Sequence, residues 1–221
     1  MFNRSPYATY QVSDGVPGRL MARTLGYLGL LLAILSAAVL FGVEFGAAGI
    51  WIGFAAAIIG TIMVSRRMAS AGVAFAWGAV VAIGMGVMIS PVIWGTAATD
   101  PGLLLQTLGA LVITILMSAA VVAWIPWDFS RIMPLLFFGL IMLIVVSLLS
   151  FFVPAFASVG ASRAFNLIGV LIFTGYLMVD FSLMRMRGRV MPGQGTAVVL
   201  AVSLLIDIVN LFLFLLRLGR R

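Results

Sequence analysis

Two aspartates lie inside long apolar stretches of this chain, Asp180 in GYLMVDFSLM and Asp207 in LLIDIVNLF. An ionised aspartate at the centre of a membrane helix costs about 2.5–3.5 kcal/mol on insertion scales, so such side chains face a protein interior or a water-filled cavity. The other carboxylates lie in polar tail or loop sequence, where a solvated charge is the simplest interpretation: Asp14, Glu44, Asp100 and Asp128. Chemistry is therefore expected at Asp180 and Asp207.

These two aspartates occur on consecutive antiparallel helices and are placed to meet. Within hydrogen-bonding distance they would share one proton, because two adjacent like charges repel. The pair would then sense protons and could contact a hard cation, which prefers oxygen ligands. The alternative is a buried polar pair that only fixes helix packing. Polar contacts in membranes contribute only about 0.6 kcal/mol of stabilisation on average, which offsets little of the cost of burying two acids.

The depth of each aspartate in its helix decides whether the two can meet. If the helix ended at Arg185, Asp180 would lie about 8 Å from its end at 1.5 Å per residue. Asp207 would lie about 18 Å from Gly195 by the same rise, too deep for contact. Pairing therefore predicts that the sequence RMRGR, residues 185–189, continues the helix.

Three further residues are expected to act on the pair. Tyr176 lies one turn before Asp180, and Asn210 lies one turn after Asp207, each on the same helix face as its aspartate. Arg66, or the arginine that follows it, would form a salt bridge with ionised Asp180 and close that end as a latch. Protonation of the aspartate would weaken this latch. The alternative is that both arginines only enforce membrane topology.

Composition identifies the chain as an integral membrane protein. Of its 221 residues, 64% are hydrophobic and 9% are charged, against about 45–50% and about 25% in soluble domains. The absence of cysteine and histidine excludes disulfides, zinc sites with these ligands, and Ser-His or Cys-His nucleophiles. We expect neither enzymatic activity nor a resident cofactor, and calcium only as a permeant ion. The net charge of +7 comes from arginines that punctuate apolar runs, so no nucleic-acid partner is expected.

The apolar runs predict an all-α bundle of seven transmembrane helices. A span needs about 20 apolar residues, and the candidate runs are 20–42, 46–64, 70–94, 103–125, 134–154, 164–184 and 196–217. Residues 1–19 are polar and predict a disordered cytoplasmic tail, which leaves 20–221 as the membrane domain. Small residues at helical spacing predict close helix crossings in the second and third spans: Gly49, Gly53, Gly78, Ala82 and Gly86.

Arginine placement favours a cytoplasmic N-terminus, with nine arginines in inside segments and four outside. The lack of lysine indicates a bacterial source, and hence the inner membrane. The basic C-terminus would lie outside by this topology. The last helix is therefore either a complete seventh span, which we adopt, or a helix that is re-entrant or packed inside the bundle.

The sequence resembles the Bax inhibitor family, also called the transmembrane Bax-inhibitor-motif family, over roughly residues 20–219. Similar segments are GYLMVDFSLMRM and the junction VSRRMASAGVAFAW. The most specific match is the pattern D-x-x-N-L-F-x-x-L-L-R, which falls on Asp207, Asn210, Leu211, Phe212, Leu215, Leu216 and Arg217.

This resemblance implies a fold and a site. The expected fold has two layers of three helices around a central C-terminal helix. The expected activity is a pH-sensitive calcium leak, gated by an aspartate pair that falls on Asp180 and Asp207. A latch arginine of the family falls on Arg66.

Three functions compete at this point. The leading hypothesis is a pH-sensitive cation (calcium) leak channel or transporter in the lipid bilayer. The alternative is a membrane regulatory protein that binds and restrains a membrane protease or a cell-death partner without conducting ions. An intramembrane aspartyl protease also needs two aspartates on neighbouring helices, but such enzymes carry G-x-G-D at the second aspartate, and LLID lacks both glycines.

Overall fold

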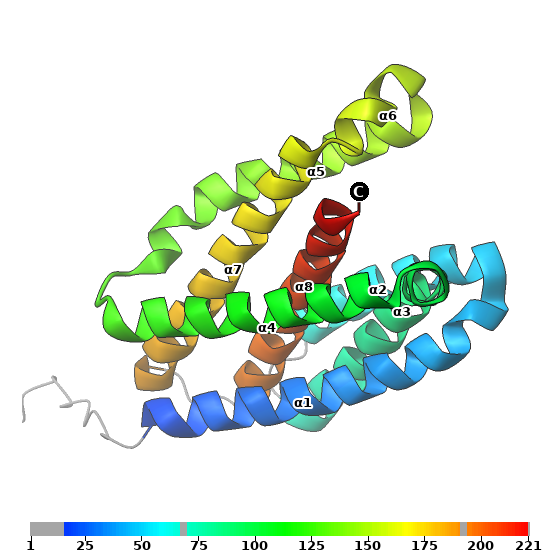
Figure 1. The fold of residues 1–221 in the computed structure, drawn as a ribbon. Coiled ribbons are helices and arrows are strands. Elements are labelled where there is room, and N and C mark those ends of the chain that lie inside the picture. The colour runs from blue at the N-terminus through cyan, green and yellow to red at the C-terminus, as the bar shows by residue number, and fades with distance from the viewer. Residues whose placement is uncertain (1–15, 67–69, 191–193, 221) are drawn as a thin grey trace, which may run out of the picture.

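The computed structural model describes residues 16–66, 70–190 and 194–220, and every regular element in these ranges is helical (Figure 1). The long helices are α1 (Val16–Gly42), α2 (Gly46–Arg66), α3 (Ala71–Thr99), α4 (Pro101–Trp124), α5 (Met133–Phe152), α7 (Arg163–Val190) and α8 (Gln194–Gly219). Shorter elements are η1 (Val43–Phe45), η2 (Phe129–Ile132) and α6 (Pro154–Gly160). Most of the predicted tail, residues 1–15, lies outside the described residues, and α1 begins at Val16.

Six segments of the described chain are long and apolar enough to cross a membrane, so this criterion does not confirm the predicted count of seven. The difference lies in the first segment, Gly18–Arg66, which has 49 residues and contains both α1 and α2. A straight helix of that length would measure about 74 Å, more than twice the hydrocarbon core of a bilayer. The 3-10 turn η1 and Gly46, at φ 57°, separate α1 from α2, and both helices pack against α3.

Local sequence chemistry sets the N-terminal boundaries of α4 and α7. At the start of α4, Pro101 occupies the first turn and the Asp100 carboxylate accepts a hydrogen bond from the Leu103 amide at 2.9 Å. At the start of α7, the Ser162 hydroxyl accepts a hydrogen bond from the Phe165 amide at 3.2 Å. These caps satisfy amides that have no partner in the first turn of a helix.

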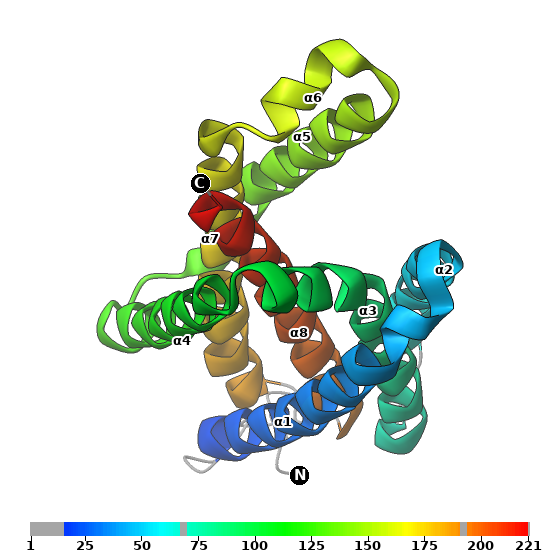
Figure 2. The same cartoon turned by 45° about the vertical axis from the view of Figure 1, so that its right-hand side comes forward.

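Helix α8 lies inside the bundle, whereas α5 lies at its edge (Figures 1 and 2). It packs against α1, α3, α4 and α7, and 67% of its most apolar window is buried, against 11% for the segment that contains α5. Burial on several sides explains why α8 carries leucines and valines around most of its circumference. The described part of the chain therefore encloses its C-terminal helix.

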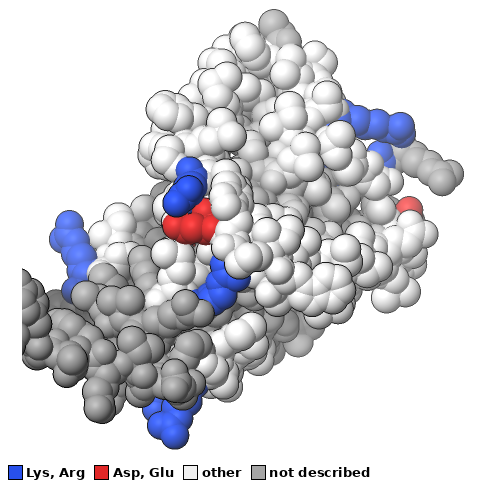
Figure 3. All heavy atoms as spheres, turned by 90° about the vertical axis from the view of Figure 1, so that its left-hand side faces the viewer, with Lys and Arg blue, Asp and Glu red and all other residues white. Residues whose placement is uncertain are grey.

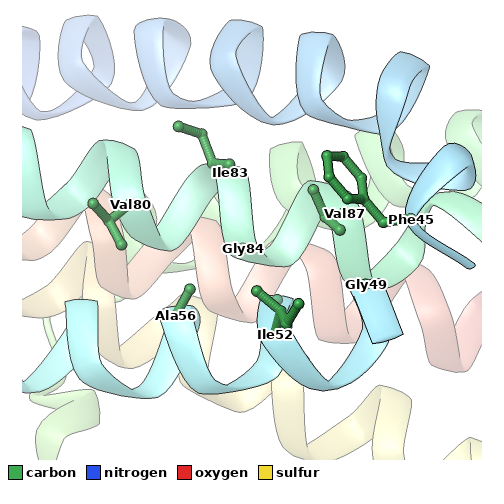
Figure 4. Close-up of a pocket in the computed structure, with 9 residues that line it drawn as sticks. Phe45, Gly49, Ile52, Ala56, Val80, Ile83, Gly84 and Val87 are labelled. Carbon is green, nitrogen blue, oxygen red and sulfur yellow. The ribbon is translucent and has the colours of Figure 1, made fainter. Parts of the chain in front are cut away.

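The crossing of α2 and α3 is close because glycines of the two helices face each other, as the small-residue spacing predicts. A Cβ added to Gly84 would lie 2.6 Å from the carbonyl oxygen of Gly53, and one added to Gly49 would lie 3.2 Å from the Val87 side chain. Figure 4 shows Gly49 of α2 and Gly84 of α3 lining an apolar groove of about 260 Å³. The third span is equally constrained at Gly86, where a Cβ would lie 2.7 Å from Ala38 of α1.

Candidate functional site

The structure brings Asp180 of α7 and Asp207 of α8 together. The two side chains are 5% and 6% exposed, and the carboxyl groups lie close enough to act on each other electrostatically. A hydrogen bond between two carboxyl groups would require one of them to carry a proton. The Oδ2 atom of Asp207 is buried and has no hydrogen-bond partner among the described residues.

The register of α7 against α8 explains why the aspartates meet. The Phe173 and Phe214 rings stack with their centroids 5.7 Å apart. Phe173 precedes Asp180 by seven residues and Phe214 follows Asp207 by seven, so in an antiparallel pair this stacking places the aspartates at the same level. A Cβ at Gly169 would collide with the Phe214 ring, so the glycine allows the close approach.

The continuation of α7 through RMRGR, on which pairing depends, is confirmed, because α7 ends at Val190. Asp180 lies ten residues before Val190, or about 15 Å, and Asp207 lies thirteen residues after Gln194, or about 20 Å. The continuation of α7 past Arg185 thus reduces the mismatch in depth from about 10 Å to about 5 Å by the same rise.

Tyr176 is near the pair and Asn210 is held by its own helix. Tyr176 is half-buried, and the charge of Asp207 acts on its phenol. The Asn210 amide nitrogen donates to the Ile206 carbonyl at 2.9 Å, one turn back along α8. Of the two supporting residues, Tyr176 is therefore the one that the structure places within electrostatic reach of the carboxyl groups.

Arg66 does not reach the aspartates in this structure. It is the last residue of α2, its side chain is exposed, and no ion pair joins it to either aspartate within the described ranges. The neighbouring Arg67 lies outside the described residues. The latch between Arg66 and Asp180 therefore stays a prediction.

Arg185 has a role that the sequence did not reveal. Its guanidinium donates to the carbonyls of Val122 at 2.7 Å, Trp127 at 2.9 Å and Ile125 at 3.4 Å. These carbonyls belong to the end of α4 and the linker after it, where Pro126 has no amide hydrogen to donate. Positive charge is favourable at a helix C-terminus. Arg185 therefore ties the C-terminal part of α7, five residues after Asp180, to the end of α4.

Asp128 adds a carboxylate to the contacts around Arg185. Hydrogen bonds from the Ser130 hydroxyl and amide lower the pKa of Asp128, and the nearby charges of Arg131 and Arg185 add to that effect against a small opposing contribution from burial. Figure 3 shows how few charged side chains interrupt the otherwise uncharged face on this side of the molecule. The hydrogen bonds of Asp128 thus order the loop after α4, where the sequence had indicated only a solvated charge.

The described residues contain no group of three or more His, Cys, Asp or Glu side chains that could hold a metal ion. Calcium takes about six to eight oxygen ligands, and two carboxyl groups supply fewer. A cation at Asp180 and Asp207 would have to keep water or use other oxygens.

Comparisons with known proteins match most of the chain to one family and a shorter segment to a bacterial protein. The family model described as "Inhibitor of apoptosis-promoting Bax1" matches residues 18–220. An uncharacterized protein, YrjE of Lactococcus lactis subsp. lactis (strain IL1403), is 40% identical over 79 residues. That alignment covers 34% of this chain and 32% of the relative, so the similarity spans about a third of either protein.

Proposed function

Because the chain belongs to the Bax inhibitor family of inhibitors of apoptosis-promoting Bax1, we propose that it is a pH-sensitive leak channel or transporter for cations, calcium among them. Asp180 and Asp207 are its proton sensor and cation contact. The observation that carries the proposal is the close approach of two buried carboxyl groups on two candidate membrane spans. A purely structural contact would need no acid, because amides or hydroxyls also join membrane helices.

The proposed mechanism is competition between a proton and a cation for one site. With one shared proton, the two carboxyl groups attract each other and hold α7 against α8. Loss of that proton leaves two like charges side by side, which repel and attract a cation. A cation between the carboxylates would replace the proton and restore the attraction, so flux and protonation become linked. We propose no catalytic step and no resident cofactor.

The test is cation flux in liposomes that contain the purified protein and a calcium-sensitive dye. We expect flux that depends on pH in the wild type, and flux without that dependence in Asp180→Asn and Asp207→Asn. Asp100→Asn is the matched control, since asparagine also caps a helix and Asp100 lies far along the chain from the pair. Identical flux in the wild type and both pair variants would refute the proposal.

Arg66 is proposed as the counter-charge of ionised Asp180 in a second conformation, in which the end of α2 moves toward α7. The exposed position of Arg66 at the last residue of α2 leaves its guanidinium free to move. Arg66→Gln should then change the flux where the pair is ionised. Unchanged flux would remove the latch and leave the role of the aspartate pair intact.

We also propose seven crossings in a bacterial inner membrane, with the N-terminus in the cytoplasm. The turn at η1 and Gly46 supports α1 and α2 as two separate crossings, and the arginine distribution supports the orientation. Reaction of single cysteines at loop positions with an impermeant reagent, applied from each side, tests this topology. Labelling of residues 43–45 from the cytoplasmic side would contradict it.

The description of the family as inhibitors of a protein that promotes apoptosis favours a second candidate function. In that case the chain binds and restrains a membrane protein, such as a protease or a cell-death factor, without conducting ions. Copurification of a stoichiometric partner from membranes, together with absence of flux in liposomes, would support this function over a leak.

A further inference from the structure

A polar cavity of about 760 Å³ lies between the C-terminal end of α8 and the turn that joins α3 to α4. Apart from two glycines and one leucine, the residues that line it carry polar side chains: Thr96, Thr99, Asp100, Gln106 and Arg220. The groove between α2 and α3, by contrast, is lined by apolar residues throughout. The wall of the polar cavity therefore presents charges and hydrogen-bonding groups that an apolar ligand would leave unsatisfied.

The cavity lies at the level of a membrane surface, because three candidate membrane spans begin or end at its wall. These spans are Ala71–Thr99, Pro101–Trp124 and Gly195–Gly219. Trp94 of α3 is 45% exposed, and tryptophan is enriched at the depth of the lipid headgroups. Next to Gln106, α4 exposes Leu105 and Leu108, which are 72% and 47% accessible. An amphipathic ligand would thus place its polar head in the cavity and its apolar tails along α4.

Arg220 supplies the positive charge of the cavity. Its guanidinium donates to the Thr96 hydroxyl oxygen at 2.9 Å, and this hydroxyl donates to the Val92 carbonyl at 2.8 Å. A guanidinium has five N–H groups in a planar arrangement that matches phosphate oxygens, so this bond leaves others for a ligand. Arg217 lies over the Phe214 ring, 5.8 Å from its centroid, and it is Arg220 that borders the cavity.

Asp100 supplies the negative charge of the cavity. Its Oδ1 atom accepts a hydrogen bond from the Leu103 amide at 2.9 Å, and a carboxylate has further lone pairs to offer. The Thr99 hydroxyl donates to the Gly95 carbonyl at 2.9 Å, so its oxygen is left as an acceptor. Gln106 adds an amide that both donates and accepts. One cation, one anion and neutral hydrogen-bonding groups therefore share one cavity.

We propose that this cavity binds the headgroup of an ethanolamine phospholipid. Arg220 binds the phosphate, and Asp100 and Thr99 accept hydrogen bonds from the primary ammonium group. The charged side chains at the wall, Arg220 at +1 and Asp100 at −1, sum to zero and complement a headgroup that carries both signs. Pockets with basic residues between membrane helices are known to bind lipid headgroups.

Two other common headgroups fit this cavity less well. A glycerol headgroup has the phosphate but no ammonium, so the lipid carries a net negative charge that the Asp100 carboxylate repels. A choline headgroup has both charges, but its ammonium is fully methylated and has no N–H group to donate to Thr99 or Asp100. The donors of the ammonium group thus determine the predicted selectivity.

Lipid binding at this cavity is separate from ion flux through the aspartate pair. Gly219, at the cavity wall, follows Asp207 by twelve residues, or about 18 Å along α8. Substitutions at the cavity therefore leave the pair intact, and lipid binding can be measured whether or not the protein conducts ions.

Native mass spectrometry of the purified full chain in detergent measures which lipid it retains. Ethanolamine, choline and glycerol phospholipids with identical acyl chains would be added singly and in pairs. We expect the wild type to bind the ethanolamine lipid at least about tenfold more tightly than either other lipid, since loss of a hydrogen bond to a charged group costs about that factor. Soluble glycerophosphoethanolamine, which lacks the acyl chains, should compete far more weakly than the lipid.

Two substitutions test the two ends of the headgroup. Arg220→Gln should weaken binding of the ethanolamine lipid by about tenfold, because it removes the charge that holds the phosphate. Thr99→Val should reduce the preference for ethanolamine over choline, because it removes an acceptor for the ammonium group. Arg163→Gln is the matched control: Arg163 is an exposed arginine at the start of α7, outside the cavity lining, and its loss should leave lipid binding unchanged.

Four results would overturn the proposal. Equal retention of all three lipids by the wild type would indicate unselective contact with the bilayer. Tighter binding of the glycerol lipid would indicate a site for negative charge alone. Equal binding of the ethanolamine lipid by Arg220→Gln and Arg163→Gln would place the lipid elsewhere on the protein. Competition by glycerophosphoethanolamine as strong as that by the lipid would assign the cavity to a soluble phosphate ester.

Discussion

Replacement of Arg185 by glutamine tests whether the contact between α7 and α4 stabilises the bundle. The guanidinium of Arg185 makes two short hydrogen bonds to the carbonyls of Val122 and Trp127 and a third, longer bond to Ile125. Hydrogen bonds to charged groups contribute about 1.5–3 kcal/mol each. Arg185 is half-exposed, so the lower value applies and the two short bonds amount to about 3 kcal/mol by that estimate.

Glutamine is shorter and uncharged, and it can replace at most one of these bonds. We therefore expect Arg185→Gln to lower the free energy of unfolding by about 2 kcal/mol. For a chain of this size, that change corresponds to a fall in Tm of about 4–8 °C. Thermal unfolding in detergent, followed by circular dichroism, measures the shift.

Arg66→Gln is the control for this measurement, because Arg66 is exposed and has no ion pair among the described residues. Substitutions at such surface positions change stability by less than about 0.5 kcal/mol. Equal shifts in Tm for Arg185→Gln and Arg66→Gln would refute the role assigned to Arg185. A large shift for Arg185→Gln alone would establish that the C-terminal end of α7 is anchored five residues from Asp180.

Two further predictions concern the loop after α4 and the glycine contact. Hydrogen bonds from Ser130 lower the pKa of Asp128, so the folded state favours its ionised form. That stabilisation is fully present above the unfolded pKa of about 4 and is lost as pH falls through the lower folded value. The Tm difference between wild type and Asp128→Asn should stay constant from about pH 5 to about pH 8 and shrink below about pH 4. A difference that grows on acidification would contradict this assignment. Gly84→Ala should lower Tm, because its Cβ would lie 2.6 Å from the Gly53 carbonyl oxygen and overpacking costs about 1–3 kcal/mol. Gly95→Ala is its control in the same helix, since nothing lies within 4 Å of that position, and alanine there should leave Tm unchanged or raise it. Equal effects of the two glycine substitutions would show that α2 and α3 can separate without cost.

Asp180 and Arg185 lie on neighbouring turns of α7, so a change in charge at the aspartate pair would act close to the Arg185 contact. Asp180 lies five residues before Arg185 on one continuous helix. A change in charge at the pair would act on α7 between two fixed points, the stacked Phe173 and Phe214 rings on one side and the carbonyls bound by Arg185 on the other. Movement of α7 away from α8 would therefore have to break one of these contacts or bend the helix between them.

The class of the protein and its aspartate pair could be predicted from the sequence because both depend on local composition. Long apolar runs with few charges specify membrane helices whatever their partners. An acid within such a run is costly enough to require a partner, and the second acid on the next helix supplies it. The continuation of α7 through RMRGR followed from the same reasoning, since contact required equal depth.

Tertiary structure decided what depends on which helix faces which. The sequence could assign Arg66 and Arg185 only to the cytoplasmic flank, because arginine favours that position in many membrane proteins. Packing of α7 beside α4 brings Arg185 to three carbonyls, whereas Arg66 is exposed at the end of α2 and forms no ion pair among the described residues. The burial of α8 also depends on packing, because α1, α3, α4 and α7 surround it. Contacts between segments distant in sequence set these features, and local hydropathy carries no information about them.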